Sequence, residues 1–77
     1  MNAAKNSTTT PETDTLSAAL IAAGFRATAK HQAVMVAALR RVVDGACPDD
    51  TGAALDPDFG REVYGPLLRR AAGRLAR

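Results

Sequence analysis

Apolar residues recur at intervals of three and four along most of the chain, which is the period of an amphipathic α-helix. The clearest stripe is made by Met35, Val36, Leu39, Val42 and Val43. No stretch of any length alternates apolar and polar residues in the way that a half-buried strand does. The pattern therefore predicts an all-α protein.

The first predicted helix spans about residues 11–23. Thr10 followed by Pro11 combines a hydroxyl cap with a proline at the first helical position, and Gly24 is typical of the residue that ends a helix. Residues 1–10, by contrast, are polar and lack periodic apolar positions. We expect them to form a disordered tail.

The second predicted helix spans about residues 29–44, with Thr28 as its cap and Gly45 as its stop. The stretch that follows, residues 46–55, contains a proline, two aspartates and a glycine. Because these residue types dominate turns, we expect a loop there.

The last part of the chain repeats the capping signal at Asp56-Pro57 and carries apolar residues at four-residue spacing. Gly65-Pro66 interrupts this pattern, and proline removes a backbone donor and clashes with the preceding turn. We therefore expect two short helices, at about 57–64 and 66–75. With the first two, they make a single helical domain over residues 11–77, a small bundle of three to four short helices after the tail.

A chain of 77 residues buries a smaller fraction of its surface than a larger domain, so its stability alone is marginal. Small proteins compensate with disulfides, a metal ion or association with another chain. One cysteine, Cys47, excludes an intramolecular disulfide, and one histidine, His31, excludes the usual Cys/His zinc site. Association with another chain is the route that remains.

His31 and Cys47 are also the one pair with residue types suited to nucleophilic catalysis. They lie at opposite ends of the second predicted helix, roughly 24 Å apart if that helix is straight. We expect His31 to be solvated and Cys47 to be a small buried residue at a helix end. The acids around Asp49 do not match the spacing of a calcium loop, and no phosphate-binding glycine loop is present. The sequence indicates a protein that is not an enzyme and needs no cofactor.

The two clusters of basic residues suggest an alternative, which is binding of nucleic acid or a nucleoprotein complex by a small regulatory or inhibitory protein. Arg40 and Arg41 form one cluster, and the C-terminal segment 69–77 holds four arginines. However, the link between the second and third helices is long and acidic, unlike the tight turn of a helix-turn-helix. No aromatic residue accompanies the basic clusters for base stacking.

No stretch approaches the roughly 18–20 apolar residues that a membrane span needs. The apolar run 16–25 is preceded by Glu12 and Asp14, where a signal peptide carries positive charge. We therefore expect neither a membrane span nor a cleaved signal, and we expect the protein to reside in the cytoplasm.

The stretch 39–68, LRRVVDGACPDDTGAALDPDFGREVYGPLL, contains an apolar helix, a proline-aspartate loop, a glycine-alanine-leucine-aspartate step and a helix that ends in a leucine pair. In these elements it resembles the small subunit (subunit 3, or gamma) of gluconate 2-dehydrogenase and related flavin dehydrogenases. The resemblance implies an accessory subunit that has no active site of its own. It also implies that the chain docks on a larger flavoprotein catalytic subunit and assists its maturation or export.

The residues themselves point to a surface on the last part of the chain, since aromatic and arginine side chains are enriched at protein interfaces. Phe59, Val63 and Leu67 are expected in the core. The predicted partner-binding residues lie a step round the helix or flank it: Tyr64, Leu68, Arg61, Arg69 and Arg70. The sequence thus favours a non-catalytic protein-binding module, and it leaves a self-associating, homodimeric helical module as a further alternative.

Overall fold

The structure, a computed structural model, describes residues 13–76. These residues form four helices and no strand, which confirms the predicted all-α class. The predicted tail at residues 1–10 and the start expected for the first helix at residue 11 lie outside the described residues.

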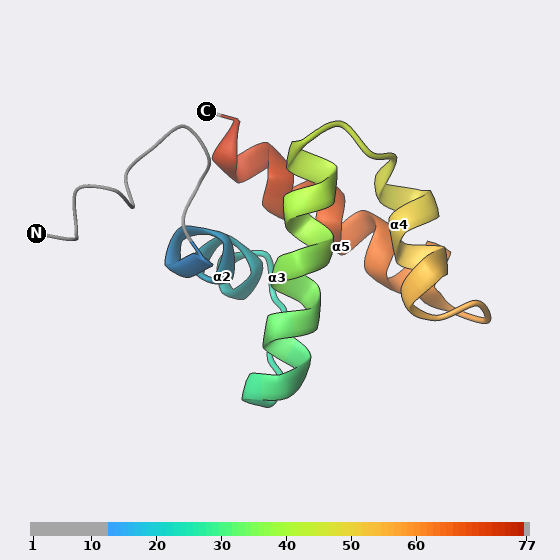
Figure 1. The fold of residues 1–77 in the computed structure, drawn as a ribbon, viewed down its shortest axis with the longest axis horizontal. Coiled ribbons are helices and arrows are strands. Elements are labelled where there is room, and N and C mark those ends of the chain that lie inside the picture. Colours follow the sequence, from blue (N-terminus) through green and yellow to red (C-terminus); the bar gives the residue numbers. More distant parts are fainter. Residues whose placement is uncertain (1–12, 77) are drawn as a thin grey trace, which may run out of the picture.

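Two long helices cross and two shorter ones pack beside them. The helices are α2 (Thr13–Ala22), α3 (Ala29–Val43), α4 (Pro48–Leu55) and α5 (Gly60–Leu75). Figure 1 shows α5 running behind α3, with α2 on one side of α3 and α4 on the other. The α4 and α5 helices form a tight helical hairpin joined by a short turn, and α2 packs against both α3 and α5.

The core lies where α2, α3 and α5 meet. Its completely buried large side chains are leucines from all three helices: Leu16, Leu20, Leu39 and Leu68. Alanines and a methionine fill the space between them. A hydrogen bond from Gln32 Nε2 to Ser17 Oγ, 2.9 Å long, also joins α3 to α2. The four leucines therefore hold three helices in one core.

The glycines expected to end the first two helices do so. Gly24 and Gly45 both have positive φ angles, 110° and 118°. The residue after each glycine donates a backbone hydrogen bond to the carbonyl five positions back, so that Phe25 bonds to Leu20 and Ala46 to Arg41. This is the Schellman arrangement, in which the left-handed residue is most often glycine. Thr28 caps α3 as expected, accepting a hydrogen bond from the His31 amide.

The loop expected at residues 46–55 is largely a helix, α4, and that expectation is wrong. Pro48 occupies the first position of α4, and Asp49 and Asp50 lie in its first turn. Proline and acids are favoured there because the first amides need no intrahelical partner and carry partial positive charge. Gly52, in the middle of the segment, is typical of turns, and this contributed to the expectation of a loop.

The break expected at Gly65-Pro66 is absent, because α5 runs unbroken from Gly60 to Leu75 with Pro66 in its interior. Proline deprives the Glu62 carbonyl of its helical partner, but Glu62 is exposed, so water can solvate that group. Leu67, Leu68 and Ala71, just beyond the proline, are buried. Packing on that side of Pro66 keeps the helix continuous.

Candidate functional site

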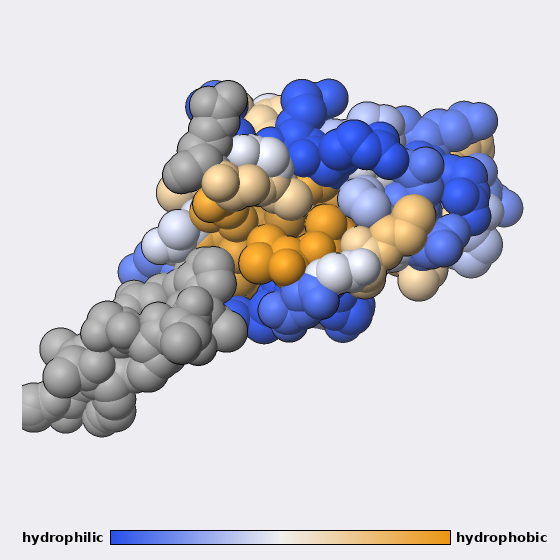
Figure 2. Space-filling model, turned by 90° about the horizontal axis from the view of Figure 1, so that it is seen from above, coloured by the Kyte–Doolittle hydropathy of each residue, from blue (hydrophilic) through white to orange (hydrophobic). Residues whose placement is uncertain are grey.

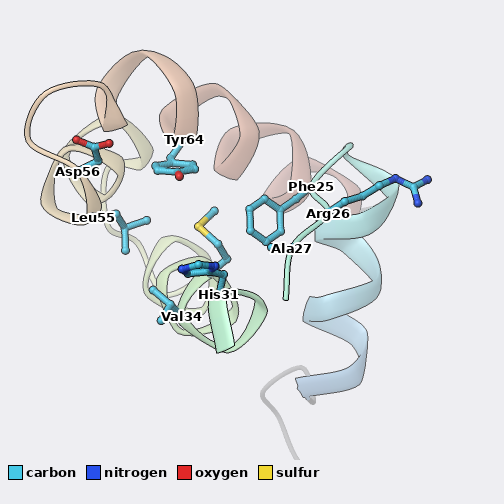
Figure 3. A pocket seen from close by; sticks show the side chains of 9 residues that line it. Phe25, Arg26, Ala27, His31, Val34, Leu55, Asp56 and Tyr64 are labelled. Atoms are coloured by element: carbon cyan, nitrogen blue, oxygen red, sulfur yellow. The ribbon is translucent and has the colours of Figure 1, made fainter. Parts of the chain in front are cut away.

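A groove of about 370 Å³ lies between the N-terminal half of α3 and the hairpin of α4 and α5. Its lining comes from every element except α2 itself: Phe25, Arg26, Ala27, His31, Val34, Met35, Leu55, Asp56 and Tyr64. Figure 3 shows Tyr64 hanging from α5 above His31 and Val34 of α3, with Phe25 closing the side of the groove. We call this site the Tyr64 groove.

Local structure places each of these side chains. The left-handed turn at Gly24 redirects the chain after α2 and sets Phe25 against the core. His31 lies in the first turn of α3, where its Nδ1 is 3.2 Å from the hydroxyl of Thr28. Val34 follows one turn later and is 48% exposed. Tyr64 lies one turn before the buried Leu68, so the packing of Leu68 directs Tyr64 into the groove.

The lining of the Tyr64 groove mixes polar and apolar surface in about equal amounts, and its two ends carry opposite charge. Figure 3 shows Asp56 at one end and Arg26 at the other, with the guanidinium of Arg26 pointing outward. Lys30, in the first turn of α3, is exposed and carries a second positive charge outside the lining of the groove. The groove therefore offers aromatic and aliphatic side chains between a cationic end and an acidic end.

Tyr64 and Leu68, the two apolar residues predicted to contact a partner, have different positions. Tyr64 is half-buried and lines the groove. Leu68 is completely buried among the leucines of α2 and α3. A side chain without exposed surface cannot contact a partner, so the prediction for Leu68 is wrong, whereas that for Tyr64 stays a prediction.

The three arginines predicted to contact a partner are exposed and bind within the chain. Arg61 pairs with Asp50 at 3.0 Å, and Arg69 pairs with Asp49 at 3.1 Å, so both connect α5 to α4. Arg70 donates to the carbonyl of Ala23 at 3.3 Å, at the end of α2. Their contact with a partner stays a prediction, since exposed pairs of this kind are weak and exchange readily with other contacts.

Phe59 and Val63, expected in the core, are instead among the most exposed apolar side chains of the described residues, at 62% and 55%. Val63 lies one turn before the buried Leu67 and on the same side of α5, so rotation of the helix is not the reason for its exposure. The apolar side chains of α5 that reach the core all follow Pro66: Leu67, Leu68 and Ala71. Of the three residues expected to share the core, Leu67 alone is buried there.

The remaining candidates for chemistry do not form a site within residues 13–76. Cys47 precedes α4 and is exposed, so the expectation that it is buried is wrong. His31 is exposed, as expected. No group of three metal-ligating side chains occurs in the described part of the chain, and no helix described there is long and apolar enough to cross a membrane.

A second, shallower hollow lies between the C-terminal ends of α3 and α5. It is lined by Val42, Val43, Ala72, Leu75 and Ala76. Figure 2 views the molecule from above and shows apolar side chains gathered in the middle of this face with hydrophilic residues around them. Unlike the Tyr64 groove, this hollow has neither an aromatic nor a charged side chain in its lining.

Sequence reasoning missed the groove because its lining comes from four segments that are far apart along the chain. The available signal was the pair of dipeptides Phe25-Arg26 and Leu55-Asp56, each of which sets an apolar side chain beside a charged one. Comparisons with family models, with curated proteins and with solved structures find no significant match to this chain.

Proposed function

We propose that this chain is a non-catalytic protein-binding module and that the Tyr64 groove is its binding site. The observation that carries the proposal is the groove itself, which holds two aromatic side chains and several aliphatic ones between ends of opposite charge. Aromatic anchors at the centre and charged groups at the rim are the usual anatomy of a protein interface. The partner that fits presents an apolar side chain flanked by charged ones.

The arginines of α5 support protein rather than nucleic acid as the partner. Arg61 and Arg69 each lie against an aspartate of α4, so this face alternates positive and negative groups. Phosphates attracted to Arg61 and Arg69 would also be repelled by the aspartates that lie against them, Asp50 and Asp49. The aromatic side chains of the groove are also separate from these arginine pairs.

A larger flavoprotein catalytic subunit is the partner class implied by the resemblance of residues 39–68. Within the fold, the residues that carry this resemblance have a structural use: Gly52 packs against α5, and Asp49 and Asp50 bind arginines of α5. The proposal of a flavoprotein partner therefore rests on the resemblance alone. We propose further that the two proteins meet in the cytoplasm.

An affinity capture of the tagged chain from its native host tests the proposal when it compares two matched variants. Val34→Arg places a charge in the groove, and Ile21→Arg places one on α2, outside its lining. Both native side chains are about half exposed in helices, so both variants should fold. We expect a stoichiometric protein to be retained by the Ile21 variant and lost by the Val34 variant. Equal retention by both variants would contradict the groove as the binding site, and a flavin absorbance in the eluate would identify the partner class.

A further inference from the structure

We propose that the occupant of the Tyr64 groove is a second copy of this chain, with Phe59 of each copy inserted into the groove of the other. The inference rests on the proposed function, since it takes the groove to be a protein-binding site. It adds the identity of the partner and the contact that recognises it.

Phe59 is the most exposed large apolar side chain among the described residues, and the turn before α5 holds it in place. The carboxylate oxygen Oδ1 of Asp56 accepts hydrogen bonds from the amides of Asp58 and Phe59, at 3.0 and 3.2 Å. Asp56 itself lines the end of the groove. Phe59 therefore projects from a hydrogen-bonded turn next to the groove, and Val63, one turn along α5, extends its apolar surface.

The charges around Phe59 complement those at the far end of the groove. Asp58 and Glu62 flank Phe59, both are exposed, and neither takes part in the ion pairs found within residues 13–76. Arg26 stands at the opposite end, and Lys30 follows it four residues later in the first turn of α3; both are exposed and outside those ion pairs. The acidic residues beside Phe59 therefore complement the cationic residues at the other end of the groove. When a second copy is turned end to end, the acidic residues of each copy face the cationic residues of the other.

A two-fold axis supplies this reversal, because an isologous interface uses the same patch on both subunits. The projection and the groove must then lie side by side on one subunit. The hydrogen bond that the Phe59 amide donates to Asp56, which lines the groove, holds them near each other. In the resulting pair, each copy sets Asp58 and Glu62 against Arg26 and Lys30 of the other. The groove volume of about 370 Å³ lies near the lower end for cavities that hold small molecules, roughly 300 Å³, which is room for an aromatic side chain.

The test is the oligomeric state of the full chain, measured by sedimentation equilibrium over a range of concentrations at low and high salt. We expect a monomer–dimer equilibrium that weakens as salt rises, because exposed ion pairs are screened. Phe59→Ser should raise the dissociation constant at least tenfold, whereas Val43→Ser, an exposed apolar position in the other hollow, should leave it unchanged. A chain that stays monomeric up to millimolar concentration, or a dimer indifferent to Phe59→Ser, overturns the proposal.

A charge swap tests the pairing independently of the apolar contact. One variant carries Asp58→Lys and Glu62→Lys, and the other carries Arg26→Glu and Lys30→Glu; all four positions are exposed, so both should fold. Each variant alone should be monomeric at concentrations where the unmodified chain dimerises, and an equimolar mixture should form a one-to-one dimer. Failure of the mixture to associate contradicts the reversed arrangement.

The experiments distinguish failure of the second-copy proposal from failure of the proposal that the groove is a binding site. A monomeric chain that still binds a different protein, with loss of binding in Val34→Arg, overturns the second copy and leaves the groove as the site. If neither self-association nor binding of another protein is affected by Val34→Arg, the proposed function itself is contradicted.

Discussion

Gly52 and Gly60 pack backbone against backbone where α4 meets α5: a Cβ atom added at Gly60 would lie 2.6 Å from the carbonyl carbon of Gly52 and still closer to its oxygen. A Cβ added at Gly52 would in turn lie 2.8 Å from the backbone nitrogen of Gly65. This contact fixes the rotation of α5. Tyr64 and Leu68 follow Gly60 at four-residue spacing, so the same rotation directs Tyr64 to the groove and Leu68 to the core.

We expect Gly60→Ala to lower the free energy of unfolding by about 2 kcal/mol or more, because the added methyl group meets backbone atoms that cannot move aside. Gly73→Ala is the matched control, since a Cβ at Gly73 meets nothing within 4 Å in the same helix. It should raise stability by about 0.5–1 kcal/mol through the higher helix propensity of alanine. Urea unfolding followed by circular dichroism gives both values. Equal effects at the two positions would contradict the close approach of α4 and α5.

The two apolar positions that sequence reasoning interchanged should respond differently to truncation. Leu68→Ala removes a completely buried side chain and should cost about 2–5 kcal/mol of unfolding free energy. Val63→Ala removes a side chain that is 55% exposed and should change stability by about 0.5 kcal/mol or less. Denaturant titrations of the two variants measure the difference. A larger loss at Val63 would show that α5 is rotated differently.

The cap of α3 should contribute measurably to stability. Thr28 Oγ1 accepts a hydrogen bond from the amide of His31, and Thr28→Ala leaves that amide without it. We expect a loss of about 1 kcal/mol, seen as a lower midpoint in thermal unfolding. Thr28→Ser keeps the hydroxyl and should retain most of the stability. A serine variant as unstable as the alanine variant would assign the effect to the lost methyl group instead.

The ion pair between Arg61 and Asp50 should add little to stability, because both side chains are more than half exposed. Arg61→Ala should change the free energy of unfolding by about 0.5 kcal/mol or less, and by still less in high salt. Thermal unfolding at two salt concentrations checks this. A loss well above 1 kcal/mol that persists in salt would mean that Arg61 has a packing role.

The helices α2 and α3 could be predicted from the sequence because their signals are local. Each has a stripe of apolar residues and ends at a glycine, Gly24 or Gly45, that adopts the left-handed conformation. The α4 helix could not, since Gly52 is unfavourable for a helix considered alone. The reason for a glycine in α4 lies in another segment of the chain, because only a residue without a side chain leaves room for the backbone of Gly60.

The orientation of α5 shows the same limit for the site. Two overlapping stripes at four-residue spacing are present in the sequence, one through Phe59 and Val63 and the other through Tyr64 and Leu68. Both stripes reach the core only beyond Pro66, where Leu67 and Leu68 are buried, whereas Phe59 and Val63, before the proline, are exposed. The sequence could single out Tyr64 as a candidate, and its role in binding stays a prediction, whereas its neighbours in the groove, from the α2–α3 turn and the end of α4, depend on the tertiary fold.

The most direct measurement is site-specific photo-crosslinking with benzoylphenylalanine at position 34, inside the Tyr64 groove, compared with position 21 on α2. We expect the probe at position 34 to give one defined protein adduct, and the second-copy proposal adds that the crosslinked peptide contains Phe59. The probe at position 21 should give little or none. No adduct from position 34, or equal yields from the two positions, would contradict the groove as a protein-binding site.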